Sequence, residues 1–108
     1  MKSTWTDGNK EYCFGVHRLV SEGAQGEPDE RLAGIYIYSR GGRQQPVAIY
    51  IDETENLTYG LTSHGRGDCI KAAGADPLIH FRKVDNADER RSLAQRLREN
   101  YKPICNQT

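Results

Sequence analysis

Two β-rich runs in the middle of the chain most constrain what it can fold into. Residues 34–38 read GIYIY and residues 47–51 read VAIYI, and a loop rich in glycine, proline and glutamine separates them. Such runs predict a β-hairpin over residues 34–51. Strand alternation places the odd-numbered residues of the second run on one face and its tyrosine on the other. Tyr36 and Tyr50 are therefore expected on the same face of adjacent strands.

The elements predicted around this hairpin come from local signals. In chain order they are a loosely held start over residues 1–10, a strand over 11–20, a surface loop over 21–30, the hairpin, a helix starting at Thr54 or Glu55, a short helix over 67–73 ending at Gly74, a strand over 78–84 and a final helix over 87–101. Asn86 can cap the final helix, and Leu93, Leu97 and Tyr101 form its buried stripe. The predicted fold is a single α/β domain over residues 1–108, in which a small, mostly antiparallel sheet of three to four strands is flanked by about three helices.

Charge and size limit the classes of function. The chain has 108 residues, which suits one domain, and its 15 Lys and Arg side chains balance 15 Asp and Glu side chains. Nucleic-acid binding draws much of its affinity from phosphate neutralisation, and proteins built for it usually carry an excess of basic residues. The composition therefore does not indicate a nucleic-acid partner, although a basic patch on one face would still provide one.

Cysteine usage and hydrophobicity bear on the cell compartment. Cys13, Cys69 and Cys105 are widely spaced and form neither a CxxC pair nor a His/Cys cluster. We therefore expect no structural zinc, and the odd count favours buried, reduced thiols over a disulfide framework. No apolar run approaches the roughly 20 residues of a membrane span, and residues 1–10 lack a signal-peptide core. These observations predict a cytoplasmic protein with no membrane partner.

The hairpin also carries a resemblance. Its GIY at residues 34–36 followed by YID at residues 50–52 resembles the paired signature of GIY-YIG nucleases, with Asp52 where the second motif has glycine. Asn56 follows at the family's spacing, and the chain closes with Y-x-P-x-x-N. The resemblance covers residues 12–106 and is closest to small stand-alone bacterial members that carry an extra N-terminal strand. Those members share a stretch that is here His64, Cys69, Gly74 and Ala75.

The resemblance implies an α/β GIY-YIG-like fold and metal-dependent hydrolysis of phosphodiesters. In that chemistry a tyrosine or a neighbouring base activates water, an arginine stabilises the developing charge, and a glutamate holds one divalent metal. Four family positions are retained as candidate catalytic residues, namely Tyr36, Tyr50, His64 and Asn106. The family's arginine position is Gly60 and its glutamate position is Ala94, so both charged groups are missing. Asp52 further adds negative charge near the expected phosphate site.

The missing charges predict a catalytically inactive GIY-YIG-like domain that binds nucleic acid or protein and needs no cofactor. The alternative is a DNA endonuclease that uses Mg²⁺ or Mn²⁺ with displaced residues. Arg43 or Arg66 would then bind substrate as a surrogate cation, and Asp52 or Glu53 would take the metal. In a third interpretation the resemblance is structural only, and the pocket does unrelated chemistry.

Each retained residue also has a non-catalytic interpretation. The two signature tyrosines suit strand aromatics that pack against helices. His64 suits a helix cap or a bond to the backbone, and Asn106 suits a tie between the C-terminal segment and the sheet.

Overall fold

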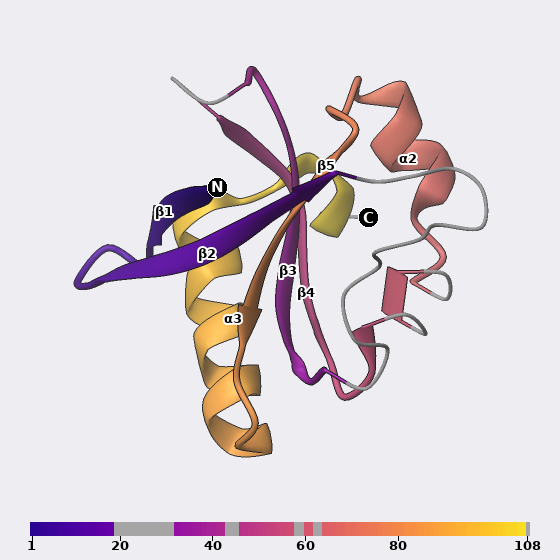
Figure 1. The fold of residues 1–108 in the computed structure, drawn as a ribbon. Coiled ribbons are helices and arrows are strands. Elements are labelled where there is room, and N and C mark those ends of the chain that lie inside the picture. Colours follow the sequence, from indigo (N-terminus) through magenta and orange to yellow (C-terminus); the bar gives the residue numbers. More distant parts are fainter. Residues whose placement is uncertain (19–31, 43–45, 58–59, 62–63, 108) are drawn as a thin grey trace.

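A five-stranded antiparallel sheet forms the centre of the molecule (Figure 1). The computed structural model describes residues 1–18, 32–42, 46–57, 60–61 and 64–107. The sheet order is β1-β2-β5-β3-β4, so β1 and β4 are the edge strands. The elements are β1 (Lys2–Thr6), β2 (Glu11–Arg18), β3 (Gly34–Arg40), β4 (Val47–Thr54), α2 (Gly67–Ala72), β5 (Leu78–Lys83), α3 (Ala87–Tyr101) and the 3-10 turn η1 (Ile104–Asn106).

The α/β class is confirmed, but the sheet has five strands where three to four were predicted, and the described residues contain two bounded α-helices, α2 and α3, where about three were predicted. Residues 1–10 are not a loose start, because β1 pairs with β2 in a register that sets Trp5 opposite Tyr12. Trp5 is only 2% exposed, and its burial stabilises the strand despite its polar neighbours. The hydroxyl of Tyr101 on α3 accepts a hydrogen bond from the amide of Thr6 at 2.8 Å. The polar residues of β1 misled the prediction because one face of this strand is exposed.

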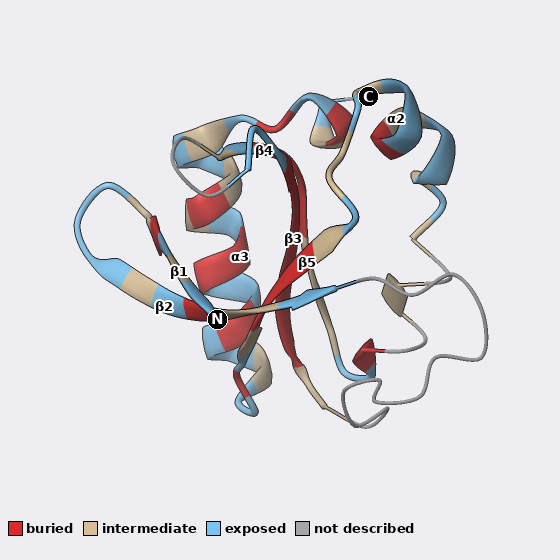
Figure 2. Cartoon of the chain, turned by 45° about the horizontal axis from the view of Figure 1, so that its top comes forward, coloured by how far each residue is buried: buried red, intermediate tan, exposed pale blue. Residues whose placement is uncertain are grey.

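Helix α3 has the predicted bounds and covers one face of the sheet (Figure 2). Asn86 caps it, since its side chain accepts a hydrogen bond from the amide of Glu89. After Tyr101 the chain turns through Lys102 at φ 48° into Pro103, which ends the helix. The cluster of side chains between α3 and the sheet, here called the α3 core, comprises Trp5, Phe14, Ile35, Ile37, Ala48, Ile51, Val84, Leu93, Ala94 and Leu97.

The opposite face of the sheet carries the tyrosines. This second cluster, here called the tyrosine core, comprises Tyr36, Tyr38, Ile49, Tyr50, Leu57, Ile70, Ile79, Phe81 and Cys105. A β-bulge between β3 and β4 determines which β4 residues join it, because Tyr38 pairs with Tyr50 but the next residue, Ser39, pairs with Ala48. The extra residue, Ile49, lies with Tyr50 in the tyrosine core. The predicted alternation is therefore wrong at Ile49, which lies with Tyr50, and at Ala48, which was expected on the face of Tyr50 and lies in the α3 core.

Two cysteines form a disulfide, which corrects the expectation of three reduced thiols. Cys69 on α2 is bonded to Cys105 on η1, and Cys13 on β2 is free and exposed. An odd count leaves one thiol over but does not prevent the other two from pairing. Helix α2 ends as predicted, with Gly74 at φ +76° donating its amide to the carbonyl of Lys71.

Other predicted elements agree in position with small differences. The strand expected over residues 78–84 ends one residue early, and the hairpin's second strand continues to Thr54. Leu57, Gly60 and Leu61 are helical, which fits the helix expected after the hairpin, whereas residues 58–59 and 62–63 lie outside the described part. The loop expected over 21–30 and the last two residues of the strand expected over 11–20 also lie outside it. None of the helices in the described ranges combines the length and hydrophobicity that a bilayer crossing requires.

A buried histidine connects three strands on the α3 side. His80 of β5 is 4% exposed, and its Nδ1 lies 2.7 Å from the hydroxyl of Ser3 on β1. Its Nε2 lies 2.8 Å from the hydroxyl of Ser39 on β3. Burial lowers the pKa of His80, against a smaller opposing effect of Asp76. A neutral ring that accepts one hydrogen bond and donates the other satisfies both serines.

Candidate functional site

Three of the four predicted catalytic side chains lie together on the tyrosine face of the sheet. The ring centroids of Tyr36 and Tyr50 are 6.1 Å apart, as expected for neighbours on adjacent strands. The His64 ring lies 5.3 Å from that of Tyr50 and 6.5 Å from that of Tyr36. Tyr38 joins them, with its ring 5.7 Å from His64. These four residues are here called the aromatic cluster.

The tyrosine that would activate water is buried. Tyr36 is 1% exposed, and its hydroxyl donates a hydrogen bond to the carbonyl of Gly60 at 3.3 Å. Burial, followed by the negative charge of Asp52, raises the pKa of Tyr36 strongly. The hydroxyl therefore keeps its proton at neutral pH, and it is poorly suited to act as a general base.

Asp52, at the position where the resemblance expects a glycine, contacts Tyr50 directly. The Tyr50 hydroxyl donates to Asp52 Oδ2 at 2.6 Å, and the amide of Glu53 donates to Oδ1 at 2.8 Å. Burial and then the Asp52 hydrogen bond raise the pKa of Tyr50. Tyr50 thus serves as a hydrogen-bond donor to a carboxylate.

A cation that sequence reasoning missed lies beside this pair. Arg98 on α3 reaches the edge of β4, where its Nη1 is 3.6 Å from Asp52 Oδ1 and 3.4 Å from the carbonyl of Ile51. It balances the carboxylate that the sequence analysis treated as an uncompensated charge. Its spacing in the sequence carried no signal, because only the packing of α3 against the sheet brings it to β4.

His64 bonds to the backbone as its non-catalytic interpretation expected. Its Nδ1 accepts a hydrogen bond from the amide of Arg66 at 2.8 Å, just before α2 begins. Burial lowers the pKa of His64, against an opposing effect of Asp52. The neutral ring then carries its proton on Nε2.

Asn106 does not join the aromatic cluster. Its Oδ1 accepts from the amide of Ile51 at 2.8 Å, and its Nδ2 donates to the carbonyl of Ile51 at 2.9 Å. The side chain thereby satisfies one residue of the β4 edge as a neighbouring strand would. This is the tie to the sheet that its non-catalytic interpretation expected.

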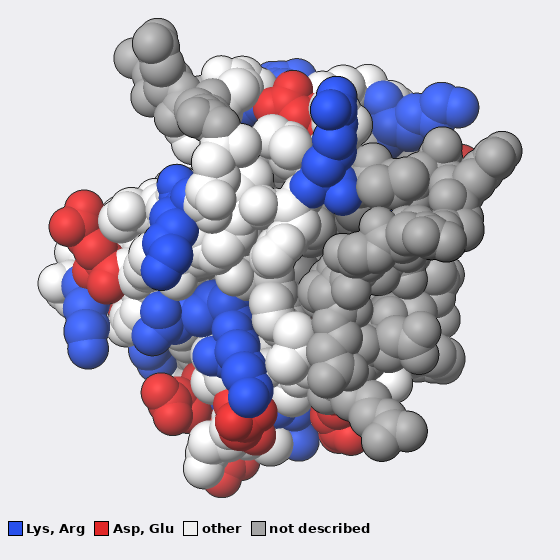
Figure 3. Space-filling view, in the orientation of Figure 1, with Lys and Arg blue, Asp and Glu red and all other residues white. Residues whose placement is uncertain are grey.

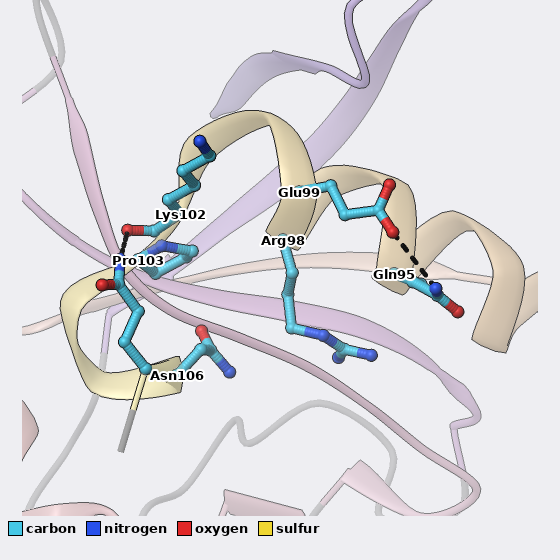
Figure 4. Close-up of a pocket in the computed structure, with 7 residues that line it drawn as sticks. Gln95, Arg98, Glu99, Lys102, Pro103 and Asn106 are labelled. Atoms are coloured by element: carbon cyan, nitrogen blue, oxygen red, sulfur yellow. Dashed lines mark hydrogen bonds between the residues drawn. The ribbon is translucent and has the colours of Figure 1, made fainter.

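A hollow lies beside this tie (Figure 4). Its volume is about 370 Å³, and it is lined by Gln95, Arg98, Glu99, Lys102, Pro103, Asn106 and Gln107. Five of its polar side chains hydrogen-bond within the protein, namely Gln95, Arg98, Glu99, Asn106 and Gln107, and the Gln95–Glu99 distance is 3.1 Å. Asn106 lines this hollow, and no residue of the aromatic cluster does.

The two predicted substrate-binding arginines have different outcomes. Arg43 lies outside the described residues. Arg66 directly precedes α2 and is half-buried, and its charge acts against the rise in the pKa of Tyr50 that burial and Asp52 cause. Arg66 therefore lies close enough to the aromatic cluster to act on the pKa of Tyr50.

The positions where the family has its charged catalytic groups are packed. A Cβ at Gly60 would meet Cβ and Oγ1 of Thr54 at 2.8 Å, so a larger side chain requires a shift of β4 or of the segment containing Gly60. Ala94 is fully buried in the α3 core, on the opposite face of the sheet from the tyrosines. A glutamate there would point into apolar side chains and away from the aromatic cluster.

The carboxylates that the endonuclease alternative assigned to a metal have protein partners. Asp52 contacts Tyr50 and Arg98, and Glu53 Oε2 accepts from Arg90 Nε at 2.6 Å. Over the described ranges, no group of three or more His, Cys, Asp or Glu side chains is arranged to hold a metal ion.

Comparisons with known proteins add no family assignment. The chain matches none of the protein-family models, curated proteins or solved structures with which it was compared.

Proposed function

We propose that this chain is a GIY-YIG-like domain that acts by binding a macromolecule and does not hydrolyse phosphodiesters. The observation that supports this most is the packing of the two positions at which the family has charged catalytic groups. Gly60 is packed against Thr54, and Ala94 belongs to the core on the far side of the sheet. Losing one transition-state donor commonly costs about 10²–10³ in rate, and here the cation and the metal ligand are both absent. Tyr36, protonated and buried, is no substitute for either group.

Charge and burial favour a protein partner over nucleic acid. Formal net charge is zero, and Lys and Arg side chains mingle with Asp and Glu on the face shown in Figure 3. Stacking on bases requires exposed rings, but Tyr36, Tyr38 and Tyr50 are at most 7% exposed. Strong, salt-dependent DNA binding is therefore not expected.

The second candidate, a metal-dependent endonuclease with displaced residues, is favoured by one observation. The cluster of Tyr50, Asp52 and Arg98 places a carboxylate and a guanidinium beside a signature tyrosine at the β4 edge. Mg²⁺ or Mn²⁺ would bind Asp52, and Arg98 would supply the cation for the developing charge.

One assay separates these candidates. Supercoiled plasmid is incubated with Mg²⁺ or Mn²⁺ and the protein, and with an Asp52→Asn variant purified in parallel. We expect no nicking by either protein. Cutting that EDTA stops and that Asp52→Asn abolishes would establish the endonuclease, whereas equal cutting by both would identify a contaminant. Fluorescence anisotropy with a labelled duplex at low and high salt then tests the expected absence of strong DNA binding.

The cytoplasmic location stays a prediction. Disulfides persist mainly in oxidising compartments, so the Cys69–Cys105 bond counts against it. Counting alkylated thiols in protein taken rapidly from its native cells would decide whether the bond exists there.

A further inference from the structure

The disulfide connects two segments that flank the aromatic cluster and the β4 edge. Cys69 lies in α2, just after His64 and Arg66, and Cys105 lies next to Asn106 in η1. Cys105 is fully buried in the tyrosine core, whereas Cys69 is partly exposed. The bond therefore joins the segment carrying His64 to the segment that caps Ile51.

Helix α2 has its own anchors on the sheet side. Arg40 of β3 donates to the carbonyl of Ala73 at 3.0 Å, and the amide of Asp76 donates to the carbonyl of Ser39 at 2.8 Å. Ile70 is buried in the tyrosine core. None of these three contacts involves the disulfide.

The 3-10 turn η1 is short and packs against β4. It consists of three residues and has no side-chain cap. Apart from the disulfide, it is held by the burial of Pro103 and Cys105, by its packing against β4 and by the two hydrogen bonds between Asn106 and Ile51. A three-residue turn without a side-chain cap belongs to the part of a protein that opens locally before the whole chain unfolds.

We propose that the Cys69–Cys105 disulfide is a redox-sensitive clasp that keeps Asn106 on the edge of β4. Reduction frees η1 while the sheet and α2 stay folded. The amide of Ile51 then loses its Asn106 partner while the carbonyl keeps Arg98, and an edge amide that the oxidised protein keeps paired becomes available. This inference concerns only η1 and its contact with the edge of β4. It does not require the binding function proposed above.

The reaction is thiol–disulfide exchange with a dithiol. A thiolate of the reductant attacks Sγ of Cys69, the more exposed sulfur, and forms a mixed disulfide while Cys105 leaves as a thiolate and takes up a proton. The second thiol of the reductant then attacks the reductant's first sulfur in the mixed disulfide. Cys69 leaves as a thiolate and is protonated. Overall, the dithiol loses two electrons and two protons and becomes a cyclic disulfide, and the protein gains two thiols.

Hydrogen exchange followed by NMR tests the clasp at single amides. The full chain is compared oxidised and after reduction with dithiothreitol, together with a Cys69→Ser variant, and Cys13→Ser serves as the matched control. On reduction and in Cys69→Ser, exchange of the Ile51 amide should speed up about tenfold or more and approach the rate of an unprotected amide, whereas amides of β2 and β5 stay protected at the level set by the remaining stability of the whole domain. In Cys13→Ser the Ile51 amide should respond to reduction as it does in the unmodified chain.

Three results would overturn the proposal. The first is an intact-mass and peptide analysis showing no Cys69–Cys105 cross-link in protein purified without reductant. The second is an Ile51 amide whose exchange is unchanged by reduction. The third is an Ile51 amide that, after reduction, stays as protected as the amides of β2 and β5, which would make the disulfide a global cross-link alone. Asn106→Ala in the oxidised protein provides an independent check, since it should release the Ile51 amide with the disulfide intact.

Discussion

Breaking the Cys69–Cys105 cross-link should lower the stability of the whole domain by a calculable amount. The two cysteines are separated by 36 residues along the chain. In the loop-closure model, a cross-link of this span removes about 13 cal/mol/K of entropy from the unfolded chain, which is about 4 kcal/mol at room temperature. Small domains are typically stable by only about 5–15 kcal/mol, so this loss is a large fraction of the total.

The corresponding change in Tm follows from the size of the chain. Unfolding entropy is about 2.1 cal/mol/K per residue, or about 0.23 kcal/mol/K for 108 residues. A loss of about 4 kcal/mol therefore lowers Tm by about 15–20 °C. Cys69→Ser is the preferred variant because Cys105 is fully buried, and truncating Cys105 would add the cost of a cavity.

Thermal unfolding followed by circular dichroism, with and without a phosphine reductant, measures this change. Reductant should lower the Tm of the unmodified protein and of Cys13→Ser alike, and it should leave Cys69→Ser unchanged. The reasoning fails if the oxidised and reduced proteins melt within about 3 °C of each other. It also fails if reductant still destabilises Cys69→Ser.

Three further predictions concern single side chains. Asn106→Ala should cost about 1–3 kcal/mol in urea unfolding, because the amide of Ile51 loses its partner; full stability would refute the edge-capping role. Arg90→Ala should lower the free energy of unfolding by about 3 kcal/mol, because it leaves the carboxylate of Glu53 without its partner in a largely buried ion pair. Arg91→Ala, which removes an exposed ion pair, should lower it by less than about 0.5 kcal/mol, and equal losses in the two variants would contradict this. Burial lowers the pKa of His80 below its ordinary value of 6.5, so the unfolded chain binds a proton first as pH falls. Tm should stay constant above pH 6.5 and decline as pH falls toward the pKa of His80 in the folded protein. His80→Gln should make that decline smaller, and an unchanged dependence of Tm on pH in the variant would refute the role of His80.

Asn106 and His64 show how far the residues alone could be interpreted. From the sequence, each of these residues has a catalytic and a structural interpretation. The structural interpretation requires a hydrogen-bond partner, and the sequence does not identify that partner. For Asn106 that partner is Ile51, on a strand far away in the chain. For His64 it is the nearby amide of Arg66, which local sequence could have suggested.

The sequence by itself determined the elements whose stabilising contacts are local. Helix α3 begins after its Asn86 cap and ends before Pro103 because caps, an i, i+4 stripe and proline act within a few residues. The division of β3 into isoleucine and tyrosine faces likewise follows from the geometry of a single strand.

Only the tertiary structure decided the contacts between distant segments. The packing of Trp5 against His80 and Tyr101, the Cys69–Cys105 bond and the position of Arg98 beside Asp52 each join residues far apart in sequence, and the bulge at Ile49 depends on the register between two strands. Local propensity does not encode such contacts, because each is selected by how whole elements pack and by which buried groups then find partners. The resemblance to GIY-YIG nucleases likewise assigned Ala94 to a catalytic position, whereas packing places it in the core on the other side of the sheet from the tyrosines.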